Sequence, residues 1–321
     1  MGQGGQGQRP EGGLRSGAPG PPRATFFDPS ASGLILRNLT LDNITAAAVD
    51  SFAGLPDARQ RELVQALVRH LHAYAREVKL SHAEWRAAMA FLHRVGDISS
   101  AERSEFSLLS DVTGLSSLVD LLGSHPQATP GSVLGPFHTV GSPWKDNPAN
   151  LIGDNAGERI LLRGRVTGTD GQPLRDAVLD FWQNAANGLY WQLDPAQPRD
   201  NLRCQLRVDA QGAYEIATIR PVPYQIPTDG PAWVDLVQPA GRGSWRPAHF
   251  HVIVSAPGHR TLVTEIFDAE DPYLERDAVF GVREALIGRY ADEQDPVAAQ
   301  RLSLPGPAVP VMRMDFRLAS A

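Results

Sequence analysis

The chain has little of several features that mark other classes of protein. Its 321 residues include one cysteine, Cys204, so no disulfide can form within the chain, and a reducing compartment fits. No apolar run approaches the length of a membrane span, and the N-terminus lacks a signal-peptide pattern. The formal net charge of -6 argues against nucleic acid or an anionic membrane surface as partner. These absences predict a soluble, cytoplasmic protein.

The remaining composition is that of an ordinary globular protein. Hydrophobic residues make up 42% of the chain and charged residues 21%, and the length suggests about two domains. Residues 1–32 are the exception, because they are dominated by Gly, Gln, Pro, Arg and Ser. Such a segment buries too little apolar surface to offset chain entropy, so it is predicted to be a disordered tail.

Residues 33–125 have helical periodicity and are predicted to form a small dimerisation domain. Apolar residues recur at steps of three and four and form one stripe: Leu63, Leu67, Leu71, Tyr74 and Val78. The capping-box patterns of Ser81 with Glu84 and of Ser99 with Glu102 predict the starts of two further helices. Several short helices alone make a thin core, so part of their apolar surface is expected at a homodimer interface.

Residues 126–321 change to short β-rich runs separated by turn signals. Strands are predicted at 159–167, 177–183, 202–208, 213–219, 249–255, 261–267 and 312–318. Residues 209–212, Asp-Ala-Gln-Gly, are a hairpin signal between two of these runs. The pattern predicts an antiparallel β-sandwich catalytic domain, mainly β, preceded by the helical domain. Long loops between some strands are the expected place for function.

The strand at 249–255 begins His249-Phe250-His251. Alternate strand residues point to the same face, so both imidazoles can approach one metal ion. Imidazole suits several transition metals, and such a pair is also consistent with two hydrogen-bonded histidines on a half-buried strand. Tyr190 and Tyr224 precede the pair in unusual, loop-like settings. Each tyrosine alone reads most simply as a core or interface residue, but two phenolates beside the histidines would favour ferric iron.

Three segments together resemble the intradiol ring-cleaving dioxygenases, the catechol and hydroxyquinol 1,2-dioxygenases. They are residues 181–190, which end at Tyr190; residues 220–231, around Tyr224; and residues 245–251, Trp-Arg-Pro-Ala-His-Phe-His. The resemblance runs from about residue 40 to the C-terminus. It implies a helical N-terminal region that forms a homodimer, with lipid at the interface as a further possibility.

The resemblance also implies one Fe(III) per subunit, held by Tyr190, Tyr224, His249 and His251. It gives Tyr224 the role of dissociating ligand and base, and it matches Arg246 to the family's active-site arginine. Ferric iron, two phenolates and one hydroxide sum to zero charge, which suits a partly buried site. A cationic Arg246 beside the ring would stabilise negative charge that develops there.

The substrate branch follows from further matches to hydroxyquinol 1,2-dioxygenases, at residues 108–111, 133–137 and 271–282. The residues implied to line the ring site are Leu108, Asp111, Gly135, Pro136, Ile226, Pro227 and Val279. Asp111 would accept a hydrogen bond from the extra hydroxyl of 1,2,4-trihydroxybenzene, although a capping or surface acid is the simpler interpretation of that residue alone. The implied substrates are an aromatic diol or triol and O2.

Three other interpretations remain beside this one. The first is catechol or chlorocatechol 1,2-dioxygenase activity. The second is a non-catalytic β-sandwich binding module, and the third a zinc hydrolase that uses His249, His251 and an acid. The third is disfavoured because the sequence places no third conventional ligand suitably. Glu265 is a departure, since catechol-cleaving members tend to carry glutamine there, and its charge would perturb the site if it pointed inward.

Overall fold

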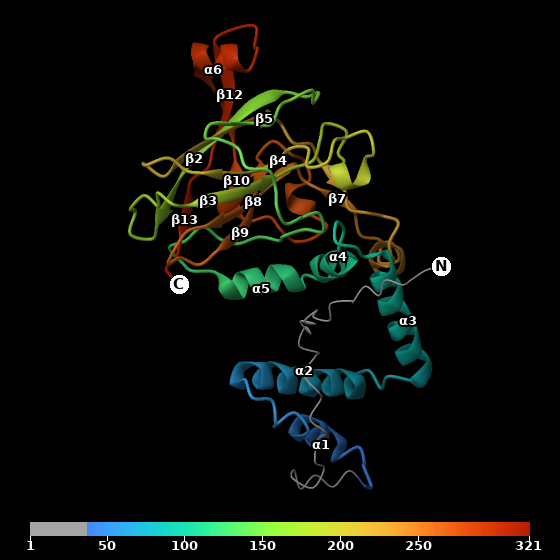
Figure 1. Cartoon of the computed structure of the whole chain (residues 1–321). Coiled ribbons are helices and arrows are strands. Elements are labelled where there is room, and N and C mark those ends of the chain that lie inside the picture. The colour runs from blue at the N-terminus through green and yellow to red at the C-terminus, as the bar shows by residue number, and fades with distance from the viewer. Residues whose placement is uncertain (1–36) are drawn as a thin grey trace, which may run out of the picture. The chain divides into compact units, whose positions relative to one another are not determined.

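A computed structural model describes residues 37–321, so the predicted tail, residues 1–32, lies outside the described residues. The chain divides into two compact units, one ending at Trp85 and one from Arg86 to Ala321. Helix α3 (His82–Ile98) contains the boundary between the units (Figure 1). The domain division expected at residues 125 and 126 stays a prediction.

The first unit contains helices α1 (Ile44–Asp50) and α2 (Ala58–Glu77). Asp57 caps α2, since its side chain accepts a hydrogen bond from the Gln60 N–H at 2.6 Å. The predicted apolar stripe lies on this helix, and each of its members, Leu63, Leu67, Leu71, Tyr74 and Val78, is about half exposed. Neither α1 nor α2 has a buried residue, so these two helices enclose no core of their own among the described residues.

Two capping sites were predicted for the helices that follow, and one of them is wrong. At the start of α3, Ser81 and Glu84 form the predicted reciprocal pair, with bonds of 2.8 and 3.3 Å. Helix α4 (Glu105–Val112) is capped by Ser104 and not by Ser99. Ser99 follows the end of α3 and links the two helices: its hydroxyl donates to the Val95 carbonyl, and its Oγ accepts from the Glu105 N–H at 3.1 Å. Helix α5 (Leu115–Gly123) comes next, after Gly114.

Two sheets form the second unit. One is built from β1 (Ala149–Asn150), β2 (Arg159–Gly168), β5 (Ala213–Ile219), β11 (Tyr290–Gln294), β12 (Ala308–Arg313) and β13 (Phe316–Leu318). The other has the order β10 (Ile287–Gly288), β9 (Leu262–Asp268), β8 (His249–Ser255), β3 (Val178–Trp182) and β4 (Arg203–Arg207). β6 (Tyr224–Gln225) and β7 (Trp245–Arg246) form a separate ribbon, and α6 (Pro296–Arg301) joins β11 to β12. Strands of both sheets are labelled in Figure 1.

The β-rich sandwich is as predicted, with antiparallel pairing between β2 and β5 and along β9, β8, β3 and β4, but both sheets also include parallel pairs and are therefore mixed. β2 pairs in parallel with both β12 and β13. The single strand that was predicted at 312–318 is divided between these two strands. The turn at residues 209–212 forms, with Gly212 at φ +74°, yet it makes no hairpin. β4 pairs with β3 in one sheet and β5 with β2 in the other, so the turn carries the chain between sheets. Turn chemistry specifies a chain reversal but not the strands that pair.

The core lies between the two sheets and orients the site. Phe250, Val252 and Val254 of β8 face this core, together with residues of β2 and β5. Because side chains alternate along a strand, His249 and His251 point to the opposite face of the sheet. The core packing therefore fixes the direction of the two imidazoles.

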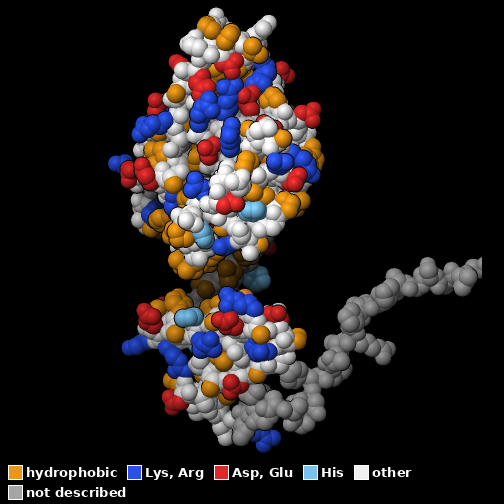
Figure 2. All heavy atoms as spheres, turned by 90° about the vertical axis from the view of Figure 1, so that its left-hand side faces the viewer, with side chains coloured by type: hydrophobic (Ala, Val, Ile, Leu, Met, Phe, Trp, Pro, Cys, Tyr) orange, Lys and Arg blue, Asp and Glu red, His pale blue; other side chains and the backbone are white. Residues whose placement is uncertain are grey.

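The surface of the second unit carries charges of both signs (Figure 2). Hydrophobic side chains gather at its lower rim in that view. The exposed apolar residues of this unit include Leu118, Val119, Leu121 and Leu122 of α5, each of which is more than half exposed. Within residues 37–321, no single helix is long and apolar enough to cross a membrane. Only α4 and α5 taken together reach that length and composition, across a bend of 77°.

Candidate metal centre

The four predicted ligands come from separate segments and are all buried. His249 and His251 lie on β8, and Tyr224 is the first residue of β6. Tyr190 precedes a short 3-10 turn at Trp191–Leu193. Their exposed fractions are between 2% and 6%, so water has little access to any of the four side chains.

These side chains form a closed ring of contacts. The ring centroids of Tyr190 and Tyr224 are 5.4 Å apart, and those of Tyr224 and His249 are 5.5 Å apart. The Nε2 atoms of His249 and His251 are 3.1 Å apart, and the His251 and Tyr190 centroids are separated by 6.2 Å. The structure therefore brings together all four residues that the sequence singled out.

The donor atoms suit a transition metal ion. His249 Nδ1 lies 2.7 Å from the Pro247 carbonyl, to which it donates, and this leaves Nε2 with a free lone pair. An Nε2–Nε2 separation of 3.1 Å corresponds to two nitrogens about 2.1 Å from one ion at an angle near ~95°. The Tyr190 hydroxyl is buried and has no hydrogen-bond partner among the described residues. An orphaned phenol beside two convergent imidazoles is the arrangement that a bound cation would complete.

Burial controls the protonation of these ligands. It lowers the pKa of His249 to about 3, with a further contribution from the nearby Arg246 charge, so the imidazole is neutral and able to bind metal. Burial also raises the pKa of Tyr190 well above 10 and that of Tyr224 above 10. Arg246 opposes the rise at Tyr224, where it is the second-largest influence. Phenolates in this site therefore require a strong positive charge next to them.

Arg246 is held between two carboxylates. Its Nε lies 2.9 Å from Asp277 Oδ1, and its Nη1 lies 2.8 Å from Glu265 Oε1. Nη1 also lies 3.2 Å from His249 Nε2, so the guanidinium borders the ligand set. All three charged side chains are buried, and burial of this kind is tolerated only because the charges are paired.

Glu265 points into the site, which the sequence alone left open. Its carboxylate lies with His249 and His251 in a group whose potential ligand atoms are within 4.8 Å of one another. The expectation that no third conventional ligand is suitably placed is therefore wrong. The missed relationship is the β8–β9 register, in which Glu265 is directly opposite His251. The family comparison below, and not the lack of an acid, disfavours a zinc hydrolase.

Aromatic side chains surround the ligands, and no local sequence pattern singles out any of them. Trp182 of β3 stacks on His251 with centroids 4.8 Å apart and planes inclined by 6°. Phe137 stacks on Tyr190 at 4.7 Å. Trp182 is the cross-strand partner of His251, so only the strand pairing could have identified it. His138 contacts Trp182 and not the ligands.

Two family models match the chain. The model described as "Catechol dioxygenase N terminus" matches residues 57–130, and the one described as "Dioxygenase" matches residues 133–318, more than half of the chain. The chain belongs to the intradiol ring-cleaving dioxygenases. It is accordingly an oxidoreductase of a family that uses non-haem iron and acts on aromatic diols with O2.

Individual members of the dioxygenase family are similar over most of the chain. The 6-chlorohydroxyquinol 1,2-dioxygenase of Cupriavidus pinatubonensis is 41% identical over 79% of this chain and 92% of its own length. The hydroxyquinol 1,2-dioxygenase of Rhodococcus opacus is 42% identical over 77% of this chain and 83% of its own length. The solved hydroxyquinol 1,2-dioxygenase of Pseudomonas putida DLL-E4 has a TM-score of 0.72 at 40% identity, covering 88% of this chain and 99% of that one.

The residues expected to bind the dioxygenase substrate lie on several segments. Leu108, Ile226 and Val279 pack in one buried apolar cluster. Gly135 has φ +73°, and a Cβ there would lie 3.0 Å from His251 Cε1, so the loop closely approaches this ligand. Pro136 and Pro227 are buried, and the Pro136 carbonyl accepts a hydrogen bond from the Ser104 N–H at 3.2 Å.

Asp111 is the one charged member of the expected ring site. It is 2% exposed at the end of α4, and burial raises its pKa to about 6. The Ser116 hydroxyl and the Arg246 charge oppose that rise. Arg246 is therefore near enough to act on Asp111 as well as on Tyr224.

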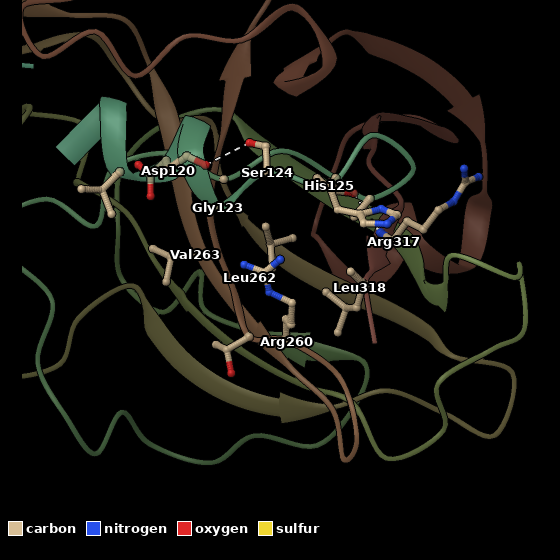
Figure 3. A pocket seen from close by; sticks show the side chains of 15 residues that line it. Asp120, Gly123, Ser124, His125, Arg260, Leu262, Val263, Arg317 and Leu318 are labelled. Atoms are coloured by element: carbon tan, nitrogen blue, oxygen red, sulfur yellow. Dashed lines mark hydrogen bonds between the residues drawn. The ribbon is translucent and has the colours of Figure 1, made fainter. Parts of the chain in front are cut away.

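A separate cavity of about 160 Å³ lies between the end of α5 and the strands β9 and β13 (Figure 3). The residues that line it include Asp120, His125, Arg260 and Arg317. None of the predicted ligands or ring-site residues lines this cavity, so it is distinct from the candidate metal centre.

Proposed function

We propose that this protein is a ferric dioxygenase that cleaves hydroxyquinol, 1,2,4-trihydroxybenzene, between its two adjacent hydroxyl-bearing carbons. Both atoms of O2 enter the product, 3-hydroxy-cis,cis-muconate, which is an enol form of maleylacetate, and no reductant is consumed. Family membership and the hydroxyquinol and chlorohydroxyquinol names of similar proteins support this substrate class.

The closed ring of Tyr190, Tyr224, His249 and His251 carries the proposal. Two neutral imidazoles and two phenols that lose their protons on metal binding would hold one Fe(III) per chain. Bound iron supplies charge transfer from the coordinated diol, which makes the ring reactive toward O2. Anionic oxygen ligands favour the ferric state, and this explains two tyrosines where imidazoles alone would suit other metals.

Tyr224 and Arg246 are proposed as the catalytic pair. A diol that binds as a dianion releases two protons; the Tyr224 phenolate oxygen would accept one of them, and the hydroxide that completes the neutral site would take up the other as water. Arg246 limits the rise of the Tyr224 pKa and borders His249, so its charge lies beside the space for the ring. That charge would stabilise negative charge on the ring during cleavage.

The ring site is proposed to consist of Leu108, Asp111, Gly135, Pro136, Ile226, Pro227 and Val279. Leu108, Ile226 and Val279 pack in one buried apolar cluster, and the buried Asp111 carboxylate is proposed to accept a hydrogen bond from the third hydroxyl of hydroxyquinol. A diol without that hydroxyl would leave Asp111 unpaired, which is the basis for preference over catechol.

The proposal is tested with purified protein, excess substrate and an oxygen electrode. We expect one O2 consumed per hydroxyquinol, with one iron per chain by metal analysis and ring-opened product by mass spectrometry. A higher specificity constant, kcat/KM, for catechol or a chlorocatechol would assign the enzyme to that branch. An iron-containing protein that consumes no O2 with any of these diols would contradict the proposed reaction.

We further propose a homodimer formed through the helical region, with lipid as an additional ligand of its interface, in the cytoplasm. The half-exposed stripe on α2 supports an interface, because a continuous apolar face of this kind is costly in water. Replacing Leu67 and Leu71 with Glu should convert a dimer into a monomer by light scattering, whereas Arg59→Glu, at an exposed ion pair on the same helix, should not. A monomeric wild type would contradict the proposal.

A further inference from the structure

Glu265 is the charged residue of this site to which sequence reasoning gave no role. It lies on β9, directly opposite His251 of β8, which is in turn opposite Trp182 of β3. The side chain is completely buried, and Oε1 lies 3.4 Å from His249 Nε2 and 3.5 Å from His251 Nδ1. A carboxylate oxygen thus lies beside Nε2 of His249 and Nδ1 of His251.

The groups around this carboxylate offer hydrogen-bond donors. Arg246 Nη1 is 2.8 Å from Oε1. Ser132 Oγ is 2.6 Å from Oε2 and 2.7 Å from the Gly281 carbonyl, so its single proton serves one of those two acceptors. Among the described residues, His251 Nδ1 and Glu265 Oε1 are both buried without a well-formed hydrogen bond, and they face each other.

That pair of atoms determines which nitrogen of His251 faces the metal. If Nδ1 carries the proton, its N–H points toward the carboxylate, and Nε2 has the lone pair that faces His249 Nε2. The other tautomer places a nitrogen lone pair opposite a carboxylate oxygen. A separation of 3.5 Å is at the outer limit of a hydrogen bond, and a shift of a few tenths of an ångström closes it.

The backbone is shaped around this charged group. At Gly281, an added Cβ would lie 2.6 Å from Glu265 Oε2, 2.8 Å from Arg246 Nη2 and 2.9 Å from Asp277 Oδ2. No side chain fits there without moving the three charged groups. Glu265 is therefore held on one side by Ser132 and Gly281 and on the other by Arg246.

We propose that Glu265 is a positioning residue of the metal centre, which accepts a hydrogen bond from the His251 Nδ1–H, holds Arg246 and adds a negative charge beside the imidazoles. This inference rests on the proposed ferric site. Glu265 is not assigned as a direct ligand, since both of its oxygens already have close partners, Oε1 with Arg246 Nη1 at 2.8 Å and Oε2 with Ser132 Oγ at 2.6 Å. A carboxylate behind a ligating imidazole orients the ring and makes it a stronger donor.

Two substitutions separate the hydrogen bond from the charge. In Glu265→Gln, the amide oxygen can keep the Oε1 contacts while the amide nitrogen donates to Ser132, which then donates to Gly281. Glu265→Met keeps the approximate volume but removes the acceptor. Glu215→Gln is the control, since Glu215 lies in the other sheet, paired with Arg163.

The readouts are iron affinity by chelator competition, the visible tyrosinate-to-iron band and the Fe(III)/Fe(II) midpoint potential. Glu265→Met should bind iron about 10- to 100-fold more weakly than wild type. Glu265→Gln should keep the affinity within about threefold, but its potential should rise and its band move to longer wavelength, because iron with less negative charge nearby is easier to reduce. Glu215→Gln should change none of the three.

Wild-type affinity in Glu265→Met would overturn the orienting role, and an unshifted band and potential in Glu265→Gln would overturn the role of the charge. If Glu265→Met does not fold, the Glu265→Gln band and potential decide the proposal alone. A wild type that binds no iron contradicts the proposed function itself. A coloured wild type with unaffected variants contradicts only the role of Glu265.

Discussion

Tyr224 and Arg246 are cross-strand partners in the short β6–β7 ribbon. This pairing makes the two tyrosines of the site inequivalent. Arg246 is the second-largest influence on the pKa of Tyr224 and counteracts burial there, but it ranks fourth at Tyr190, where Tyr224 itself adds to the rise. The tyrosine beside the arginine is thus the better candidate for a group that exchanges a proton during the reaction.

The first prediction concerns Tyr224→Phe. The variant should retain iron through its three remaining ligands, while kcat falls by about 10²- to 10⁴-fold because the base is lost. Tyr290→Phe is the control, since the Tyr290 hydroxyl is buried without a partner among the described residues and belongs to β11, outside the ligand set. Iron content and kcat are measured on the same samples. A Tyr224→Phe enzyme with an undiminished rate would remove Tyr224 from this role.

The second prediction concerns substrate choice. Asp111→Ala should lower the ratio of kcat/KM for hydroxyquinol to that for catechol by at least about 10-fold, because the partner of the third hydroxyl is gone. Asp120→Asn provides the comparison: burial raises the pKa of that carboxyl to about 6 as well, but it lines the separate cavity of Figure 3. Equal ratios in wild type and Asp111→Ala would contradict the assignment.

The third prediction is a pH-dependent stability cost of Asp111. Its pKa is raised from 3.8 to about 6, so the folded protein binds the proton more tightly than the unfolded chain. The free energy of unfolding therefore falls by up to about 3 kcal/mol as the pH rises from about 4 to 6. In metal-free protein, Asp111→Asn should raise the free energy of unfolding most at pH 8, and by about a third as much at pH 4.5. Denaturant titrations at both pH values check this, and a gain independent of pH would refute it.

The fourth prediction concerns the space at Gly281. Gly281→Ala places a methyl group against Glu265 and Arg246, and it should cost about 1 to 3 kcal/mol of stability and reduce kcat/KM at least about 10-fold. Gly243→Ala is matched, because neither glycine has a positive φ and nothing lies within 4 Å of an added Cβ at Gly243. If both variants behave like wild type, the charged group is not as tightly enclosed as the structure indicates.

Sequence periodicity predicted the kinds of elements but not how they pair. The His249–Ser255 strand and the Ala213–Ile219 strand lie where they were expected, because each has a run of β-formers bounded by turn residues. The turn at 209–212 was expected to make a hairpin, and it connects two sheets instead. Which strands become neighbours is decided by burial of whole sheet faces, and a local turn signal contains no information about it.

The candidate site likewise contains residues that the sequence singled out and residues that only the pairing of strands brings into it. The structure brings together the four residues that the family resemblance singled out, and their assignment as ligands stays a prediction. Trp182 and Glu265 were not assigned a role, because each meets His251 only through strand register. Asp277 was missed for a related reason, since its contact with Arg246 joins residues 31 positions apart. Contacts made by β-pairing and long loops have no local sequence signature.

The visible absorption spectrum of the purified protein, measured together with its metal content, tests the two-tyrosine, two-histidine ferric centre most directly. We predict a red to burgundy protein with one iron per chain and a broad visible band. That band should disappear on reduction to the ferrous state and weaken in Tyr190→Phe and Tyr224→Phe. A colourless protein that contains stoichiometric zinc, or a band unaffected by both tyrosine substitutions, would contradict the assignment.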